Sequence, residues 1–221
     1  MDSAPAVQEK STLQKLWPVA ACGAGLFSDG YVNCVIGSVS TILGRIYGDE
    51  FKLSQAQKLV SSIMFAGTVL GMIVFGYLSD KWSRKNSLLV STLILAVFAA
   101  MSAGAYGHNG SHEGMFAGLA AYRFLVGIGI GGEYPAGSVA CAESSGEMNE
   151  GTRNRWFIIF TNFMINIGFV LGAFVPYLCV VATGENHLWV AWRVMLGIGA
   201  VVPFILIFMR SKLEEPKEFS K

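Results

Sequence analysis

Charged residues are scarce in this chain. Only 14% of its 221 residues are Asp, Glu, Lys or Arg, whereas soluble globular domains contain roughly 25%. The formal net charge of +1 provides no basic surface for phosphate backbones, so nucleic acid is excluded as a partner class. Apolar residues take the place of charge: they make up 53% of the sequence, and the mean hydropathy is +0.51. This balance predicts a polytopic membrane protein in a lipid bilayer.

Cysteine is also rare. The four cysteines all fall within apolar segments: Cys22, Cys34, Cys141 and Cys179. They have neither the spacing of a metal site nor the pattern of a secreted disulfide framework, and we interpret them as small apolar packing residues. Zinc motifs, a nucleophile elbow and paired catalytic acids are likewise missing from the sequence. We therefore expect no enzymatic activity, no metal site and no cofactor.

Six apolar segments of about 20 residues divide the chain, and each is long enough to cross the hydrocarbon core as a helix. They are Pro18–Leu43, Leu59–Leu78, Ser87–Tyr106, Met115–Ala142, Phe157–Ala182 and Leu188–Met209. The links between them are too short to form a soluble domain. We expect an all-α membrane protein with a cytosolic tail at residues 1–17, a six-helix transmembrane bundle at 18–209 and the start of a cytoplasmic loop at 210–221.

Lysine and arginine are distributed unevenly over the links. When the N-terminus is placed inside, most of them, Arg210 included, fall on the cytoplasmic side. The outer loops then hold only Arg45, Lys52 and Lys58. The positive-inside rule therefore predicts that both termini are cytoplasmic. His108 and His112 fall in an outer loop, where we expect them to be inert.

Two acidic residues lie inside apolar spans, in matching sequence contexts. Asp29 and Glu133 each follow a G-x-G pattern, four residues after its second glycine. A charged side chain at mid-bilayer costs about 2.5–3.5 kcal/mol on insertion scales, so such residues are functional candidates. They lie on the first and fourth spans, which run in opposite directions. This predicts two inverted three-helix repeats.

Glycines recur at a spacing of four on the second and fifth spans. The two pairs are Gly67 with Gly71 and Gly168 with Gly172. Small residues at this spacing allow helices to approach closely. The pairs fit equivalent contacts in the two repeats, and generic helix packing is the alternative.

The link between the second and third spans reads Gly76-Tyr77-Leu78-Ser79-Asp80-Lys81-Trp82-Ser83-Arg84-Lys85. It resembles the G-x-x-x-D-R/K-x-G-R/K-R/K loop of the major facilitator superfamily, with Ser83 in place of the usual glycine. Leu213–Lys217 resembles the P-E-S-P-R segment that follows the sixth span in that superfamily. Basic side chains in such a loop can pair with carboxylates at neighbouring helix ends. The resemblance implies a cytoplasmic gate, with a plain positive-inside loop as the alternative. The gate residues would be Gly76, Asp80, Lys81, Arg84, Lys85, Glu143, Arg155 and Glu214.

The fourth span reads Arg123-Phe124-Leu125-Val126-Gly127-Ile128-Gly129-Ile130-Gly131-Gly132-Glu133-Tyr134-Pro135. It is similar to the R-F-x-x-G-x-G-x-G-G-D-Y-P segment of the phosphate:proton symporter clade, with Glu133 in place of aspartate. Together with Phe27-Ser28-Asp29-Gly30-Tyr31, it looks most like the fungal glycerophosphodiester permeases. The resemblance covers essentially the whole chain. It implies the N-terminal half of a proton-coupled symporter for glycerophosphoinositol or glycerophosphocholine, in the plasma membrane, with a second six-helix half as its partner.

Asp29 and Glu133 are the candidates for proton coupling, because a carboxylate removed from water titrates closer to neutral pH than one in solvent. The alternative is a structural acid permanently paired with Arg123. Ten residues separate Arg123 from Glu133, which is about 15 Å along a helix axis. We therefore expect the partner of Arg123 on another helix, where the arginine is either a structural partner or a contact for an anionic substrate.

Neutral polar side chains accompany the two acids. Asn33 lies one turn beyond Asp29, and Asn162 and Asn166 are four residues apart and therefore share a helix face. Amides and phenols suit phosphate oxygens and sugar hydroxyls. We expect Asn33, Tyr134, Asn162 and Asn166 to line a polar cavity. In the symporter clade, the tyrosine after the acid and an amide of the fifth span contact phosphate, which the resemblance carries over to Tyr134 and Asn166. Interhelical hydrogen bonds are the alternative for the asparagines.

Three other functions stay open at this point. The first is an inorganic phosphate:proton symporter. The second is a six-span protein that works as a homodimer, in which each copy serves as the other's half. The third is a non-transporting, regulatory six-helix protein, in which neutralising Asp29 or Glu133 would leave the phenotype unchanged.

Overall fold

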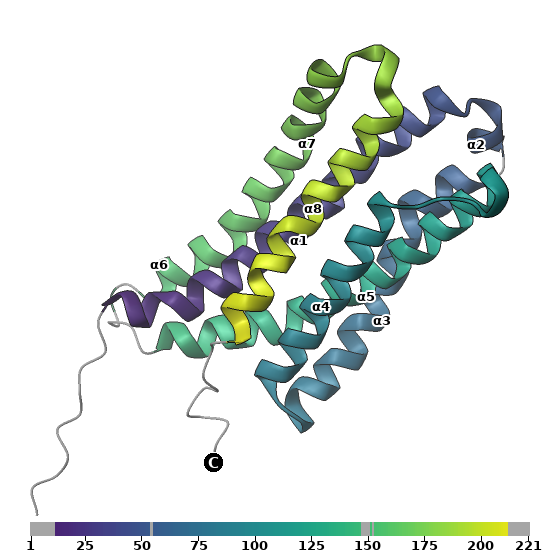
Figure 1. The fold of residues 1–221 in the computed structure, drawn as a ribbon. Coiled ribbons are helices and arrows are strands. Elements are labelled where there is room, and N and C mark those ends of the chain that lie inside the picture. Colours follow the sequence, from purple (N-terminus) through teal and green to yellow (C-terminus); the bar gives the residue numbers. More distant parts are fainter. Residues whose placement is uncertain (1–11, 54, 147–150, 152, 212–221) are drawn as a thin grey trace, which may run out of the picture.

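Six long helices form one bundle in the computed structural model (Figure 1). It describes residues 12–53, 55–146, 151 and 153–211, and these ranges contain no strand. The long helices are α1 (Thr12–Ile46), α3 (Ala56–Lys81), α4 (Arg84–Ala103), α5 (His112–Gly146), α7 (Met164–Thr183) and α8 (Leu188–Ser211). All six are long and apolar enough to span a membrane. The all-α prediction is confirmed, and the chain is a multi-pass membrane protein.

Short elements occupy the links. They are α2 (Asp49–Leu53), the 3-10 turns η1 (His108–Gly110) and η3 (Glu185–His187), and α6 (Arg153–Ile158) with the π-helical η2 (Ile159–Phe163). The last two continue directly into α7, so the fifth span contains a π-bulge. Such bulges are rare in proteins overall, and those that occur are often found at functional sites.

The helix bounds differ from the expected spans mainly at their ends. The helix α1 begins at Thr12, within the segment expected as the tail. The third span was expected to reach Tyr106, but α4 ends at Ala103 because Gly104 caps it, its N–H donating to the carbonyl of Ala100. Hydropathy locates the apolar part of a helix, whereas capping groups decide where it stops.

Helix pairing follows the predicted inverted repeat. The first span, α1, packs along the fifth, α7, and the fourth span, α5, packs along the second, α3. Likewise α1 contacts α8, and α5 contacts α4. The contact of α1 with α7 therefore corresponds to that of α5 with α3, and the contact of α1 with α8 corresponds to that of α5 with α4. Two inverted repeats that interleave require such matching pairs.

Glycines make the two equivalent helix contacts close. A Cβ added to Gly67 would overlap the backbone of Phe124 on α5, and one added to Gly168 would overlap the backbone of Phe27 on α1. The same holds for Gly71 against the backbone of Ile128, and a Cβ on Gly172 would overlap the Cβ of Cys34 on α1. The expectation that these glycines allow close approach in both repeats is confirmed. Van der Waals contact of this kind drives helix association within a bilayer, where the hydrophobic effect contributes little.

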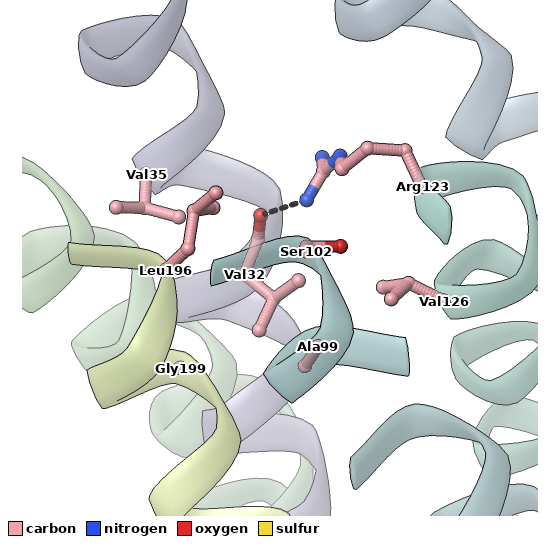
Figure 2. Close-up of a pocket in the computed structure, with 8 residues that line it drawn as sticks. All are labelled: Val32, Val35, Ala99, Ser102, Arg123, Val126, Leu196 and Gly199. Carbon is pink, nitrogen blue, oxygen red and sulfur yellow. Dashed lines mark hydrogen bonds between the residues drawn. The ribbon is translucent and has the colours of Figure 1, made fainter. Parts of the chain in front are cut away.

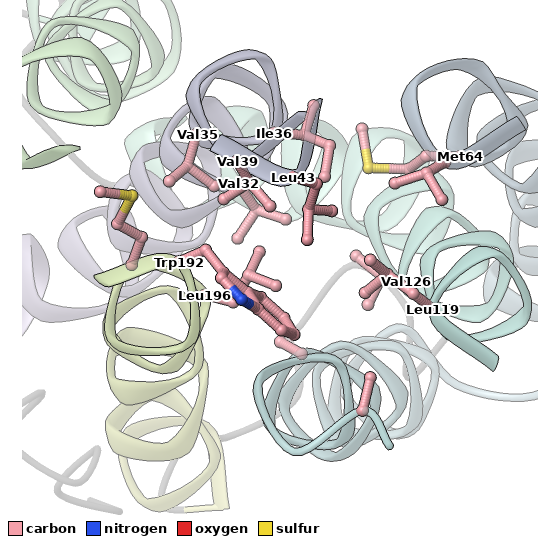
Figure 3. Packing of buried hydrophobic residues seen from close by; sticks show 14 of the residues in the cluster. Val32, Val35, Ile36, Val39, Leu43, Met64, Leu119, Val126, Trp192 and Leu196 are labelled. Carbon is pink, nitrogen blue, oxygen red and sulfur yellow. The ribbon is translucent and has the colours of Figure 1, made fainter. Parts of the chain in front are cut away.

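The helix α1 lies at the centre of the bundle. Of its apolar span 72% is buried, against 33% for α3 and 17% for the fifth span. The core is made of aliphatic side chains from α1 and α5 packed around the fully buried Trp192 of α8 (Figure 3). The flanking helices α3 and α7 expose large apolar side chains such as Phe65 and Phe174, as a surface in contact with lipid or with other helices requires.

Candidate functional site

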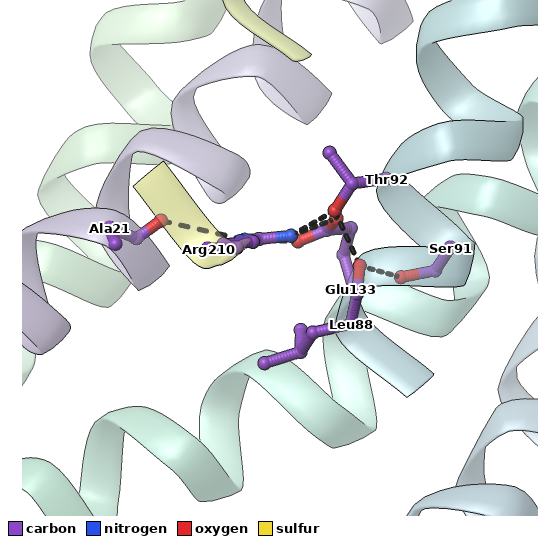
Figure 4. Close-up of polar contacts among 6 residues, drawn as sticks. All are labelled: Ala21, Leu88, Ser91, Thr92, Glu133 and Arg210. Carbon is purple, nitrogen blue, oxygen red and sulfur yellow. Dashed lines mark hydrogen bonds and ion pairs between the residues drawn. The ribbon is translucent and has the colours of Figure 1, made fainter. Parts of the chain in front are cut away.

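Glu133 forms a buried ion pair with Arg210 of α8 (Figure 4). Arg210 Nη1 lies 2.5 Å from Glu133 Oε1, and Nη2 lies 2.7 Å from Oε2, which makes the contact bidentate. The Thr92 hydroxyl of α4 lies 2.8 Å from Glu133 Oε1 and also accepts a hydrogen bond from Arg210. All three side chains are buried. Charge-assisted, bidentate contacts of this type are among the strongest polar interactions in proteins.

The ion pair joins four helices. Arg210 Nη2 also lies 3.4 Å from the backbone carbonyl of Ala21 on α1. One turn further along α1, a Cβ on Gly25 would overlap both Arg210 Nη2 and Glu133 Oε2. The second glycine of the G-x-G pattern in the first span therefore leaves room for the ion pair, which connects α1, α4, α5 and α8.

Asp29 lies close to this cluster but is not bonded to it. Its side chain is completely buried, and neither carboxyl oxygen has a hydrogen-bond partner in the part of the chain that the structure describes. It interacts electrostatically with Glu133 and Arg210, and Tyr134 interacts electrostatically with Asp29. The structure thus brings together the two acids that the sequence singled out, and only Glu133 forms a direct ion pair with Arg210 in the part of the chain that is described.

Arg123 lies apart from both acids. It is buried, and its Nη1 donates to the backbone carbonyl of Val32 on α1 at 3.2 Å (Figure 2). Its partner therefore lies on another helix, as expected, but it is a carbonyl and not a carboxylate. The alternative in which Arg123 is the permanent partner of Glu133 is wrong, because Arg210 occupies that position.

A small cavity adjoins Arg123 (Figure 2). Arg123 and Ser102 are its polar lining residues, and Val32, Val35, Ala99, Val126, Leu196 and Gly199 complete it. The Nε and Nη2 groups of Arg123 have no hydrogen-bond partner among the described residues. An arginine with free donors in a buried, apolar setting is suited to receive an anionic group.

Two of the three asparagines use their side chains for hydrogen bonds within one span. Asn33 Nδ2 donates to the Asp29 carbonyl at 2.8 Å, and Asn166 Nδ2 donates to the Asn162 carbonyl at 2.7 Å. Asn162, inside the π-bulge, and Asn166 are exposed on the outside of this bundle, whereas Asn33 and Tyr134 are half-buried. Within the described ranges, no hydrogen bond joins these asparagines to the carboxyl groups of the two acids. That these residues line one polar cavity stays a prediction.

The expected gate is described only in part. Ser83 caps α4, its hydroxyl accepting from the backbone N–H of Asn86 at 3.2 Å. This gives the departure from glycine in the superfamily pattern a structural role, since serine is a favoured N-cap residue. Asp80, Lys81 and Arg155 are exposed, and Gly76, Arg84 and Lys85 are half-buried. The side chain of Glu143 and all of Glu214 lie outside the described residues, so the predicted pairing stays a prediction.

Three residues of interest were not identified from the sequence. Arg210 was counted as a loop charge, and Thr92 was read as part of an apolar span. One signal was present: Arg210 follows Phe208 and Met209 without a break in the apolar run. His112, expected to be inert, lies 2.7 Å from Glu50 of α2 and against the ring of Tyr47. This exposed pair links α2 to the start of α5, 21 residues before Glu133 in the same helix.

Residues 17–220 match the family described as "Sugar (and other) transporter". The chain is 44% identical over 215 residues to the glycerophosphocholine permease GIT4 of Candida albicans. This match covers 97% of the present chain and 40% of GIT4. The chain is also 44% identical over 207 residues to the major glycerophosphoinositol permease GIT3 of the same organism, covering 93% and 38%. The chain therefore spans about 40% of the length of the curated relatives that it matches.

Solved structures support the fold independently. The chain superposes on the xylose transporter XylE from E. coli, in a partially occluded inward-open conformation, with a TM-score of 0.77 and 20% sequence identity. The match covers 95% of this chain and 51% of that one. The predicted resemblance to one half of a major facilitator transporter is confirmed.

Proposed function

The chain belongs to the sugar (and other) transporter family, and we propose that it is the N-terminal six-helix half of a proton-coupled symporter for glycerophosphodiesters. One observation carries the proposal. Asp29, a carboxyl group with no partner among the described residues, is completely buried in a span of a chain that is 44% identical to glycerophosphodiester permeases. An intramembrane acid of this kind is a candidate for handling protons.

In the proposed cycle, the buried acids Asp29 and Glu133 form the proton-coupling site. A proton from the outer solution neutralises a cavity carboxyl group, and a phosphodiester anion then binds beside it with less repulsion. Reorientation of one half against the other releases both inside. We assign Asn33, Tyr134, Asn162, Asn166 and Arg123 to the polar surface that contacts the substrate.

The exposed side of the fifth span supports the proposal of a second half. Asn162 and Asn166 face outward from this bundle, and polar side chains are unfavourable against lipid. A second six-helix bundle packed on this side would place both amides between the halves, where the substrate site of such transporters lies. The expected orientation, with both termini cytoplasmic and the protein in the plasma membrane, belongs to the same proposal.

The choice between phosphodiesters lies outside this half. One relative named for glycerophosphocholine and one named for glycerophosphoinositol are equally similar to the chain, at 44% identity. This equal identity is expected if the present half recognises the phosphate that both substrates share and the second half recognises the alcohol that differs between them. An inorganic phosphate substrate is the second candidate, because the clade resemblance around Glu133 includes phosphate:proton symporters.

Uptake in cells that lack their own carriers tests the proposal. Labelled glycerophosphocholine, glycerophosphoinositol and inorganic phosphate are offered to cells that express the chain alone, or the chain fused to the second half of a relative. We expect the fusion protein to take up a diester, with stimulation by external acid and with loss of uptake in Asp29→Asn. Uptake by the chain alone would favour the homodimer. Uptake of phosphate only would replace the substrate, and no uptake of any of the three would refute the assignment.

A further inference from the structure

We propose that the two buried acids have different roles: Arg210 holds Glu133 permanently ionised as a structural partner, and Asp29 alone binds and releases the coupled proton. The inference rests on the proposed function and deepens it. It makes Arg210 a positioning residue that acts on the site through Glu133, and it separates two residues that the sequence treats as equivalents.

Glu133 is held as a carboxylate by its contacts. Both of its oxygens face Arg210 nitrogens, at 2.5 and 2.7 Å, and Oε1 also lies 2.8 Å from the Thr92 hydroxyl. Protonating Glu133 would leave the buried guanidinium without its counter-charge, and an uncompensated buried charge is strongly destabilising. Glu133 therefore has no route to a neutral form that keeps the four helices joined.

Asp29 has the opposite surroundings. Neither of its oxygens accepts a hydrogen bond within the described ranges, and its side chain is completely buried. The charged and titratable groups that face it are Glu133 and Tyr134 from α5 and Arg210 from α8. The helix α7, which packs along α1, contains no charged residue. Since Arg210 is already bonded to Glu133, an ionised Asp29 would add an unpaired buried charge, which is avoided by protonation.

The proton step follows from this difference. In the arrangement seen here, Asp29 carries the proton as a carboxylic acid, and the Arg210–Glu133 pair is neutral as a unit. When reorientation opens the bundle to water, the Asp29 O–H bond breaks, the proton leaves to solvent, and the carboxylate is hydrated. Reprotonation from the other side restores the buried form. Glu133 and Arg210 keep their charges throughout.

Infrared spectroscopy of the purified 221-residue chain in lipid nanodiscs tests this division of roles. A protonated carboxyl group has a C=O stretch distinct from that of a carboxylate, so the two acids can be followed by titration without any transport. The variants are Asp29→Asn and the double variant Arg210→Gln/Glu133→Gln, which removes Glu133 together with its counter-charge. Glu113→Gln is the control at an exposed acid of α5. We expect the protonated band at neutral pH to disappear in Asp29→Asn and to keep its area in the double variant and in the control. Glu133→Gln alone is not used, because it would leave the buried Arg210 without its counter-charge and Asp29 would ionise to replace it.

Arg210→Gln tests the positioning role. With the guanidinium removed, we expect Glu133 to protonate, so that a second carboxyl band appears and is lost again in Arg210→Gln/Glu133→Gln. Arg193→Gln is the matched control, because the hydrogen bonds that the structure describes for this arginine of the same helix go to backbone carbonyls, and its guanidinium otherwise lies over the ring of Trp192. If Arg210→Gln does not fold, the double variant, which carries neither charge, is measured in its place and must retain the Asp29 band.

Three results would overturn the inference. They are a protonated band that disappears in Arg210→Gln/Glu133→Gln, no protonated band in the unmodified chain, and a folded Arg210→Gln without a second band. These readouts are separate from uptake. Failure of uptake with the expected bands would refute the proposed function and leave the protonation assignment in place, whereas uptake with the opposite bands would do the reverse.

Discussion

Replacing Gly30 by alanine tests the close contact between α1 and α7. A Cβ at this position would overlap the backbone carbonyl of Ile165 and lie 3.2 Å from the Cα of Gly168. Backbone atoms of a packed helix cannot rotate away as a side chain can, so the two helices must separate. Inserting one extra carbon into a well-packed interior typically costs about 1–3 kcal/mol. Alanine also favours the helical state over glycine by about 1 kcal/mol, which would partly hide that cost.

Gly37→Ala on the same helix removes this ambiguity. No atom lies within 4 Å of a Cβ placed at Gly37, so this variant carries the propensity gain without the overlap. The difference between the two variants therefore isolates the packing cost of about 1–3 kcal/mol. For chains of 150–250 residues each kcal/mol shifts the thermal midpoint by about 2–4 °C, so Gly30→Ala should unfold roughly 2–12 °C below Gly37→Ala.

Thermal unfolding of both variants in the same detergent, followed by circular dichroism, measures this difference. Equal midpoints would refute the close approach of α1 and α7. The inverted repeat supplies a second, independent pair. Gly131→Ala on α5 would place a Cβ against the Thr68 carbonyl of α3, whereas at Gly118 the nearest neighbour is in ordinary contact at 3.9 Å. Gly131→Ala should therefore unfold below Gly118→Ala by a similar margin, and an effect in only one repeat would contradict the equivalence of the two contacts.

Three further predictions concern single polar contacts, and unfolding measured as above checks each of them. Ser83→Ala should lower the free energy of unfolding by about 1 kcal/mol through loss of the α4 cap, and Ser83→Gly by only a few tenths; equal losses would show that the hydroxyl does not cap. Thr92→Val removes the hydroxyl beside a charged pair and should cost about 1.5–3 kcal/mol, whereas Thr92→Ser should retain most of the stability; a neutral Thr92→Val would contradict the contact. Glu50→Gln should change stability by less than about 1 kcal/mol, because its pair with His112 is solvent-exposed; a larger loss would show that this contact holds α2 against α5.

The sequence by itself determined the spans and the repeat. Within a bilayer every backbone polar group must be satisfied inside the segment, so an apolar run of sufficient length is a helix whatever its neighbours are. The six spans were therefore predictable, and only their ends, set by caps such as Gly104, were not. The glycines at spacing four on the second and fifth spans indicated close contacts for a similarly local reason, because only a residue without a side chain allows another backbone to approach.

Only the tertiary structure decided which charges meet. Asp29 and Glu133 occupy matching sequence positions, and the partner that makes them different, Arg210, lies 77 residues from Glu133 in the chain. Sequence distance carries no information on such a contact, and the positive-inside rule treats an arginine at the end of a span as a loop charge. Whether its side chain turns toward solvent or into the bundle depends on the space and the hydrogen-bond acceptors that neighbouring helices offer. Here Gly25 of α1 leaves the space and the Thr92 hydroxyl of α4 accepts a hydrogen bond. That space exists only once four helices have packed together.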